Sequence, residues 1–423
     1  MSKYAAVMHK FSLAMTKESS QVNFFAVPPL MPYKFATLAI HTGSEADKNT
    51  GAVINPISLS TTYAQVEAAK PVGAFEYSRS DNPNRAQFES VVAALEQAKF
   101  GLAYASGSAV TANVLQAFQN SHIVSIGDVY GGTHRYFTKV AGVHGIKTSF
   151  TNDIHSELAS LITPDTRLVW IESPSNPTLT ITDIAAVAAV VKRAQQSQEI
   201  YLVVDNTFLS PYIQTPLVLG ADLVVHSVSK YINGHSDVIM GVAATNNELL
   251  HSKLRFLQNA IGAIPSPFDS WLAHRGVKTL HLRVKASSDS ALVIAKYLES
   301  RIGKDVLSVN YPGLESNPKR DIVLRQHRDG LGGGMISFRI KGEAKHASDF
   351  CAQLKLFTFA ESLGGVESLC EVPAAMTHAG IPKEAREASG VYDNLIRLSV
   401  GIEDVDDLLE DIKHALAKVT QTA

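Results

Sequence analysis

The feature that most constrains the fold is an alternation of short apolar runs and amphipathic stretches through the middle of the chain. Apolar runs of strand length are predicted at 122–126, 146–150, 167–171, 201–205 and 222–226. Helical stretches, such as the one at 183–196, lie between them. This alternation is typical of a largely parallel sheet that is covered by helices on both faces, and it predicts an α/β fold.

The remaining pattern divides the chain into segments. Residues 1–33 are irregular and lack the continuous apolar core of a signal peptide, so we expect an irregular N-terminal extension. Residues 34–83 carry turn signals without a helical period, which predicts an extended arm. The alternating pattern occupies 84–277 and predicts a large domain. Residues 278–423 are predicted to form a smaller C-terminal α+β domain.

Composition narrows the classes of function. The 423 residues contain 38 Lys and Arg against 40 Asp and Glu, a net charge of −2 that predicts neither a nucleic-acid partner nor a charged membrane surface. The longest apolar run, 184–191, is too short to span a bilayer. Cys351 and Cys370 lack metal-type or redox-type spacing. We therefore expect a cytoplasmic protein with free thiols and no metal site.

Lys230 stands out because it follows a predicted buried strand. The stretch 221–241 opens with the apolar run 223–225, continues through Ser227 and Ser229, and reaches Lys230 just before turn residues. Burying an ammonium group is costly, and a desolvated lysine can lose its proton and become a nucleophile that forms Schiff bases. An isolated S-x-S-K pattern is more typical of a surface lysine after an edge strand, and the stretches described next argue against that interpretation.

Asp205 supplies a second group for the same chemistry. It ends the predicted strand at 201–205, one strand before Lys230. Adjacent parallel strands would bring both residues to the edge of the sheet where α/β proteins bind ligands. A carboxylate for a pyridinium nitrogen and a lysine for a Schiff base are the groups that pyridoxal phosphate requires. Together the two residues indicate such a site, although Asp205 alone could simply cap a loop.

Other stretches offer contacts for a phosphate or a ring, each with an ordinary structural alternative. Gly107 and Ser108 lie in a small-residue turn that enters a helix, where backbone N–H groups favour an anion. Tyr130 precedes two glycines and could lay its ring on a planar cofactor or leave its hydroxyl in water. Tyr77 and Arg79 would point the same way along an extended segment and could contact a phosphate or lie on the surface.

The C-terminal part contains one further candidate. Arg397 lies inside an apolar strand predicted at 395–400, where it could clamp a carboxylate or face solvent from an edge strand. The glycine run 330–334 precedes a strand rather than a helix, so it predicts a turn or a bulge and not a dinucleotide loop.

Taken together, these stretches resemble the pyridoxal-phosphate enzymes of cysteine and methionine metabolism. The similarity extends from about residue 35 to residue 417. The motifs that carry it are YSRSDNPNR (77–85), ASGSA (105–109), DVYGGTHRYF (128–137), ESPSNPT (172–178), VVDNTF (203–208), SVSKYINGHSD (227–237) and AESLGGVESL (360–369). The resemblance implies a fold type I PLP-dependent transferase-like architecture, with a mostly parallel sheet flanked by helices and a smaller C-terminal α+β domain.

The resemblance also implies roles for individual residues. The residues that would bind pyridoxal 5′-phosphate are Tyr77, Arg79, Gly107, Ser108, Tyr130, Asn176, Asp205, Ser227, Ser229 and Lys230. The residues that would contact the substrate are Tyr77, Glu361, Ser362 and Arg397. Lys230 would be the catalytic lysine and Tyr130 the stacking, catalytic tyrosine. Tyr77 and Arg79 would reach the phosphate from a neighbouring subunit, in a homotetramer built of dimers.

Within the family, the segments 261–283 and 376–391 are most similar to fungal and other eukaryotic members that cleave L-cystathionine. The implied reaction is an α,γ-elimination that yields L-cysteine, 2-oxobutanoate and ammonia. Members that instead build cystathionine share every cofactor residue and remain an alternative. Members that cleave methionine differ in having a cysteine where Gly132 stands. A non-catalytic binding protein is a rival of another class, against which the intact Lys230, Asp205 and Arg397 argue.

Overall fold

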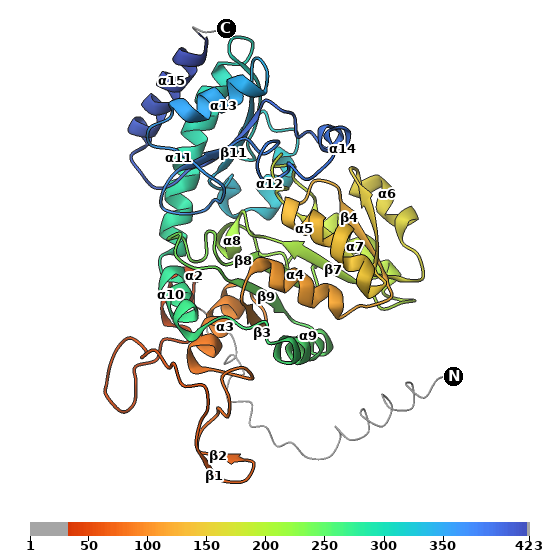
Figure 1. The fold of residues 1–423 in the computed structure, drawn as a ribbon, viewed down its shortest axis with the longest axis vertical. Coiled ribbons are helices and arrows are strands. Elements are labelled where there is room, and N and C mark those ends of the chain that lie inside the picture. Colours follow the sequence, from red (N-terminus) through yellow and green to blue (C-terminus); the bar gives the residue numbers. More distant parts are fainter. Residues whose placement is uncertain (1–32, 421–423) are drawn as a thin grey trace.

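In the computed structural model, which describes residues 33–420, the middle of the chain forms a seven-stranded sheet (Figure 1). Its strands are β3 (Phe100–Tyr104), β4 (His122–Ile126), β5 (Lys147–Thr151), β6 (Thr166–Glu172), β7 (Tyr201–Asp205), β8 (Leu223–Ser227) and β9 (Gly241–Thr245). They lie in the order β3-β9-β8-β7-β6-β4-β5. All neighbours from β8 to β5 are parallel, and β9 runs antiparallel to both of its neighbours.

Helices cover both faces of this sheet because its strands are apolar on both sides. One face packs against α4 (Gly107–Gln116), α6 (Ile154–Leu161), α7 (Ile184–Ala194) and α9 (Glu248–Ile261). The other face packs against α3 (Pro83–Leu95) and α10 (Pro267–Val277). The short helices α5 (Gly131–Arg135) and α8 (Ser210–Ile213) follow β4 and β7. A π-helical turn (Tyr136–Val140) and a 3-10 turn (Ala141–His144) continue from α5.

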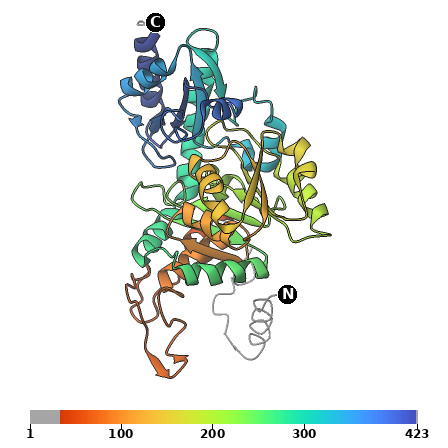
Figure 2. The same ribbon diagram turned by 45° about the vertical axis from the view of Figure 1, so that its right-hand side comes forward.

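A second, smaller sheet of five strands lies beyond the long helix α11 (Leu280–Ser300), as Figures 1 and 2 show. Its strands are β10 (Val306–Asn310), β11 (Met335–Ile340), β12 (Thr358–Phe359), β13 (Leu369–Glu371) and β14 (Leu395–Ser399). Its helices are α12 (Arg320–Gln326), α13 (Ala344–Gln353), α14 (Lys383–Ala388) and α15 (Val405–Thr420), with a 3-10 turn at Arg328–Gly330. A separate apolar core fills the space between this sheet, α11, α13 and α15.

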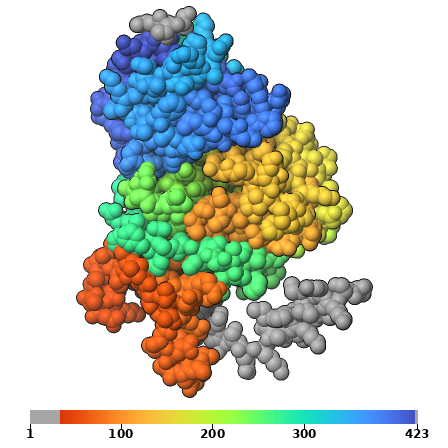
Figure 3. Space-filling model, viewed as in Figure 1, coloured from red at the N-terminus to blue at the C-terminus, as the bar shows by residue number. Residues whose placement is uncertain are grey.

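Much of the segment 42–82, which precedes α3, projects away from both sheets and forms the lower end of the molecule in Figure 3. It contains a small hairpin of β1 (Gln65–Glu67) and β2 (Lys70–Pro71). Apolar side chains on it are exposed, with Val53 at 83% and Leu59 at 68%. An arm that leaves such side chains in water has no core of its own within one chain.

The fold class predicted from the sequence is confirmed, whereas the start of the predicted extended arm is helical. The sheet is mostly parallel and flanked by helices, and a smaller α+β unit follows it. Residues 34–83 are not extended throughout, because α2 (Phe35–His41) forms at their start and buries Ala39. Most of the predicted N-terminal extension, residues 1–32, lies outside the described residues. No helix among residues 33–420 is long and apolar enough to cross a membrane.

Candidate active site

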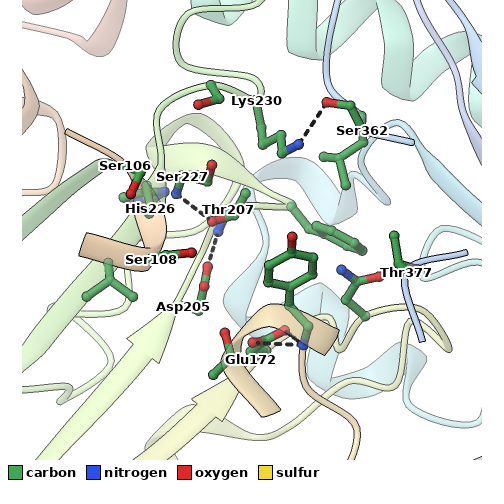
Figure 4. A pocket seen from close by; sticks show the side chains of 18 of the residues that line it. Ser106, Ser108, Glu172, Asp205, Thr207, His226, Ser227, Lys230, Ser362 and Thr377 are labelled. Carbon is green, nitrogen blue, oxygen red and sulfur yellow. Dashed lines mark hydrogen bonds between the residues drawn. The ribbon is translucent and has the colours of Figure 1, made fainter. Parts of the chain in front are cut away.

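A cavity of about 560 Å³ opens where the carboxyl ends of β6, β7 and β8 meet the first turn of α4 and loops of the smaller sheet (Figure 4). Most of the residues predicted from the sequence line this cavity. They are Gly107, Ser108, Tyr130, Asn176, Asp205, Ser227, Ser229, Lys230, Glu361, Ser362 and Arg397. The edge of the sheet expected to bind a ligand is therefore the edge that carries the cavity.

Lys230 reaches the cavity from the turn after β8. Its Nζ donates a hydrogen bond to Ser362 Oγ at 2.7 Å. Burial lowers the pKa of Lys230 to about 8, and the nearby positive charge of Arg397 acts in the same direction. Glu371 and Glu361 oppose this shift. A lysine with such a pKa is partly neutral near physiological pH and is available as a nucleophile or a base.

Asp205 lies at the end of β7 and has few partners for its charge. The backbone N–H of Thr207 donates to Asp205 Oδ1 at 2.9 Å. Burial raises the pKa of Asp205 above its ordinary value, and the contacts from Thr207 only partly oppose that effect. Asp205 forms no ion pair with any other residue of the described range 33–420. A cationic ring nitrogen would supply the missing partner.

The start of α4 offers a site for a phosphate beside β8. Ser106 caps the helix by accepting a hydrogen bond from Ala109 N at 3.0 Å, and the helix begins at Gly107. A Cβ on Gly107 would lie only 3.2 Å from the Cβ of Ser227, so the helix start and the strand end approach closely. Free N–H groups of a helix start next to the serine hydroxyl suit an anion. Ser229 Oγ also accepts from Met240 N at 3.0 Å.

Tyr130 stands at the entrance of α5 with 42% of its surface exposed. Its backbone N–H donates to both carboxyl oxygens of Glu172, at 3.1 and 3.0 Å. A Cβ on Gly132 would lie 2.4 Å from the Tyr130 ring. A side chain at position 132 would therefore require the Tyr130 ring to move from this position.

Arg397 connects the two sheets at the other side of the cavity. It is buried on β14, its Nη1 donates to Asn176 Oδ1 at 3.0 Å, and its Nη2 donates to the carbonyl of Ser362 at 2.9 Å. Glu371, its register partner on β13, forms an ion pair with Nη2 at 3.0 Å. Ser362 has a φ of +100°, a conformation that favours glycine, so its contacts hold it in a costly geometry.

Tyr77 and Arg79 do not reach the cavity of their own chain. They line a separate hollow of about 410 Å³ between the arm and residues 264–267. Arg79 Nη1 donates to the backbone oxygen of Asn259 at 2.9 Å and to its Oδ1 at 3.1 Å. Both residues are exposed on the arm and could contact another subunit.

Other residues of the cavity were not assigned a role from the sequence. Glu172 is the last residue of β6 and Thr207 lies two residues after the end of β7, so their position within sequence motifs at strand ends was a usable signal. Thr377 lines the cavity from the loop after β13, whereas Glu371 on β13 contacts Arg397 without lining the cavity. No sequence pattern placed either residue near Lys230. Thr377 Oγ1 donates to Glu371 Oε1 at 2.9 Å and so extends the contacts of Arg397.

The residues of the cavity fit pyridoxal phosphate. Asp205 offers a carboxyl group that has no ion pair within residues 33–420 for a ring nitrogen. The start of α4 offers a site for a phosphate, and Lys230 offers an amine for an aldehyde. Lys230 and Asp205 belong to neighbouring strand ends of one sheet edge, which places all these groups around a single space.

The chain is similar to known proteins over most of its length. The family described as "Cys/Met metabolism PLP-dependent enzyme" matches residues 36–417. Cystathionine gamma-lyase of Saccharomyces cerevisiae is 65% identical over 388 residues, which cover 92% of this chain and 98% of that protein. The human protein of the same name is 50% identical over 385 residues, or 90% of this chain and 93% of that protein.

Solved structures show the same fold. The crystal structure of the yeast cystathionine gamma-lyase has a TM-score of 0.89 and 64% identity, with 92% of this chain and 99% of that chain covered. A cystathionine gamma synthase from Xanthomonas oryzae pv. oryzae has a TM-score of 0.87 and 38% identity, with coverage of 93% and 100%. This chain therefore belongs to the Cys/Met metabolism family of pyridoxal-phosphate-dependent enzymes.

Proposed function

We propose that this enzyme cleaves L-cystathionine by α,γ-elimination to L-cysteine, 2-oxobutanoate and ammonia. The observation that carries the proposal is the shared contact at Ser362. Its hydroxyl accepts a hydrogen bond from Lys230 and its carbonyl accepts one from Arg397. Ser362 thereby fixes Lys230, the base, and Arg397, the group that would bind the substrate carboxylate, on either side of one position. The α-carbon of an amino acid needs both groups close to it, because it carries the proton to be removed and the carboxylate to be bound. The relatives named cystathionine gamma-lyase support the choice of substrate.

Pyridoxal phosphate is the cofactor of this family, and its bound form supplies an aldehyde that links to amines and a protonated ring that withdraws electrons. Lys230 would hold the aldehyde carbon when no substrate is bound. Asp205 would keep the proton on the ring nitrogen, and Tyr130 would cover the ring. The start of α4, with Ser227 and Ser229, would hold the phosphate, and Asn176 would lie near the ring oxygen.

The substrate steps use the chain's own acids and bases. Arg397 binds the α-carboxylate with the N–H groups that its protein contacts leave free. The neutral amine of Lys230 would take the proton from the α-carbon and pass it on. The same amine would then take up the proton that leaves the β-carbon and could deliver it to the departing sulfur. The bond between the γ-carbon and sulfur breaks, and the sulfur takes up a proton and departs as cysteine. One water molecule is consumed as the remaining four carbons leave as 2-oxobutanoate and the α-amine as ammonia.

Glu361 would select the far end of the substrate. It precedes Ser362 and lines the cavity, and its negative charge acts on Lys230. Because Ser362 faces the α-carboxylate end, the neighbouring side chain is free to face the distal ammonium group of cystathionine. A carboxylate there provides a charge-assisted hydrogen bond.

We further propose that the site is completed by a second subunit. Tyr77 and Arg79 lie outside the cavity of their own chain, on an arm with exposed apolar side chains. Both residues would contact the cofactor phosphate of a neighbouring subunit, and Tyr77 would also contact the substrate bound there, in a homotetramer built of dimers.

The proposed units of the chain are the arm at 34–83, the cofactor-binding domain at 84–277 and the C-terminal domain at 278–423. The proposed location is the cytoplasm.

A cystathionine γ-synthase is the second candidate, because the Xanthomonas structure named as one shares the fold at 38% identity. Purified enzyme should be assayed for 2-oxo acid and thiol release from cystathionine and, separately, for cystathionine formation from an activated homoserine plus cysteine. Faster cleavage than formation supports the lyase. Formation that is faster by an order of magnitude would assign the chain to the synthases.

A further inference from the structure

Glu172 is a buried acid of the cavity that the mechanism above does not use. It ends β6 and is paired in register with Asp205 at the end of β7 (Figure 4). Neighbouring strands lie about 4.8 Å apart, and side chains at paired positions of parallel strands point to the same face. A second carboxyl group therefore lies beside the one that would serve the ring nitrogen.

The hydrogen bonds of Glu172 show a residue that holds a loop. Both of its carboxyl oxygens accept from the backbone N–H of Tyr130, at 3.1 and 3.0 Å. Only 4% of Glu172 is exposed, so water does not compete for these contacts. Because Tyr130 begins the turn into α5, the contact sets the position of the ring that covers the cofactor.

The surroundings of Glu172 disfavour a negative charge. Burial raises the pKa of Glu172 well above its ordinary value, and the charges of Asp205 and Asp128 raise it further, against the lowering effect of the Tyr130 N–H. Asp128 is itself engaged by the hydroxyl groups of Ser175 and Thr178.

No cation compensates Glu172 within the described range 33–420. The cationic residues of the cavity lining have other partners, since Lys230 donates to Ser362 and Arg397 pairs with Glu371. His226 acts on Asp205, and its own buried partner is Glu96, at 2.6 Å. An isolated buried carboxyl group in such a place takes up a proton.

We propose that Glu172 is a positioning residue that works as a neutral acid, holding Tyr130 over the cofactor ring and leaving Asp205 as the single negative charge beside the ring nitrogen. The inference rests on the proposed function, because it assigns the ring to this part of the cavity. Two adjacent carboxylates would repel each other, and one of them would have to be neutral. The contacts select Glu172 for that role, because Asp205 gains a cationic partner and Glu172 does not.

Matched amide substitutions on the two strands test this division of roles. Glu172→Gln keeps an accepting oxygen for Tyr130 and carries no charge. The holoenzyme variant should retain its visible circular dichroism band, and its cofactor Kd and kcat/KM should stay within about threefold of the original values. Asp205→Asn makes the same change one strand away, and it should weaken cofactor binding and kcat/KM by about a hundredfold or more.

Glu172→Leu removes the acceptor and leaves the Tyr130 N–H unpaired in a buried place, so cofactor binding should weaken by about tenfold or more and the dichroism band should shrink. Melting temperatures of the apoenzymes identify a variant that fails to fold, in which case Glu172→Asp takes the place of the leucine variant.

The outcomes separate the inference from the proposed function. If Glu172→Gln were as impaired as Glu172→Leu, an ionised carboxylate would be required at this position. That result would overturn the proposal that Glu172 works as a neutral acid. A fully normal Glu172→Leu would overturn the positioning role. A normal Asp205→Asn would instead remove the ring-nitrogen assignment, and the proposed function with it.

Discussion

The lowered pKa of Lys230 makes cofactor uptake by the apoenzyme depend on pH in a defined way. Only the neutral amine attacks the cofactor aldehyde. With a pKa of about 8, about one Lys230 in ten is neutral at pH 7. An ordinary lysine with a pKa of about 10.4 would be neutral in about one molecule in 2,500. The cavity is therefore expected to speed cofactor attachment at pH 7 about 200-fold.

The assay follows the growth of visible absorbance after apoenzyme is mixed with pyridoxal phosphate between pH 6 and 10. Because the pKa is lowered, the reactive form of Lys230 is gained as pH rises through about 8, and the rate should level off above that value. A small amine of known pKa, measured in parallel, corrects for ionisation of the cofactor itself.

A substitution that removes the charge of Arg397 tests why the pKa of Lys230 is lowered. Arg397 is the charge that lowers the pKa of Lys230 after burial, so Arg397→Met should move the midpoint to higher pH. Arg325→Met is the control, since Arg325 is an exposed arginine that pairs with Asp183 outside the cavity. A midpoint near 10 in the unaltered protein, or an unchanged midpoint in Arg397→Met, would refute the reasoning.

The other predictions concern single side chains of the proposed site. Lys230→Ala should lose the absorbance of the lysine-linked cofactor and all turnover while keeping its fold, and an active variant that keeps this absorbance would remove Lys230 from its role. Reassembled mixtures of Arg79→Ala and Lys230→Ala chains should regain activity, because one of the two sites in a hybrid dimer collects both intact residues; hybrids as inactive as their parents would argue against a shared site. Glu361→Ala should lower kcat/KM for cystathionine by about ten- to a hundredfold, since a charge-assisted hydrogen bond contributes about 1.5–3 kcal/mol. Homoserine lacks the distal amine and should be affected far less, so equal losses on both substrates would return Glu361 to an ordinary loop position.

Local sequence patterns were sufficient to predict the centre of the large sheet. The apolar runs that end in Asp205 and Ser227 form β7 and β8, and their carboxyl ends meet at the cavity. This works because adjacent parallel strands with helical crossovers leave little choice of edge. The antiparallel strand β9 was not predicted, because the small residues of Gly241–Thr245 lack the β-branched pattern that marks a buried strand.

Local sequence patterns could not predict contacts between segments that are far apart in the chain. Arg397 could be recognised as a candidate, but its ion pair with Glu371 joins two strands of the smaller sheet that are distant in the sequence. Its hydrogen bond to Asn176 joins that sheet to the loop after β6 of the large one. The helix α2 was missed because it has only seven residues, too few for a helical period to be visible. The proximity of Glu172 to Tyr130 depends on how the loop after β4 folds back over β6.

The proposed reaction breaks the bond between sulfur and the γ-carbon of cystathionine. Cystathionine has two carbon–sulfur bonds, and the products identify the bond that breaks. Purified holoenzyme should be incubated with L-cystathionine, and the amino acids and 2-oxo acids quantified by chromatography. The proposed cleavage predicts cysteine and 2-oxobutanoate in equal amounts. Homocysteine with pyruvate, or no cleavage at all by a yellow, folded enzyme, would contradict it.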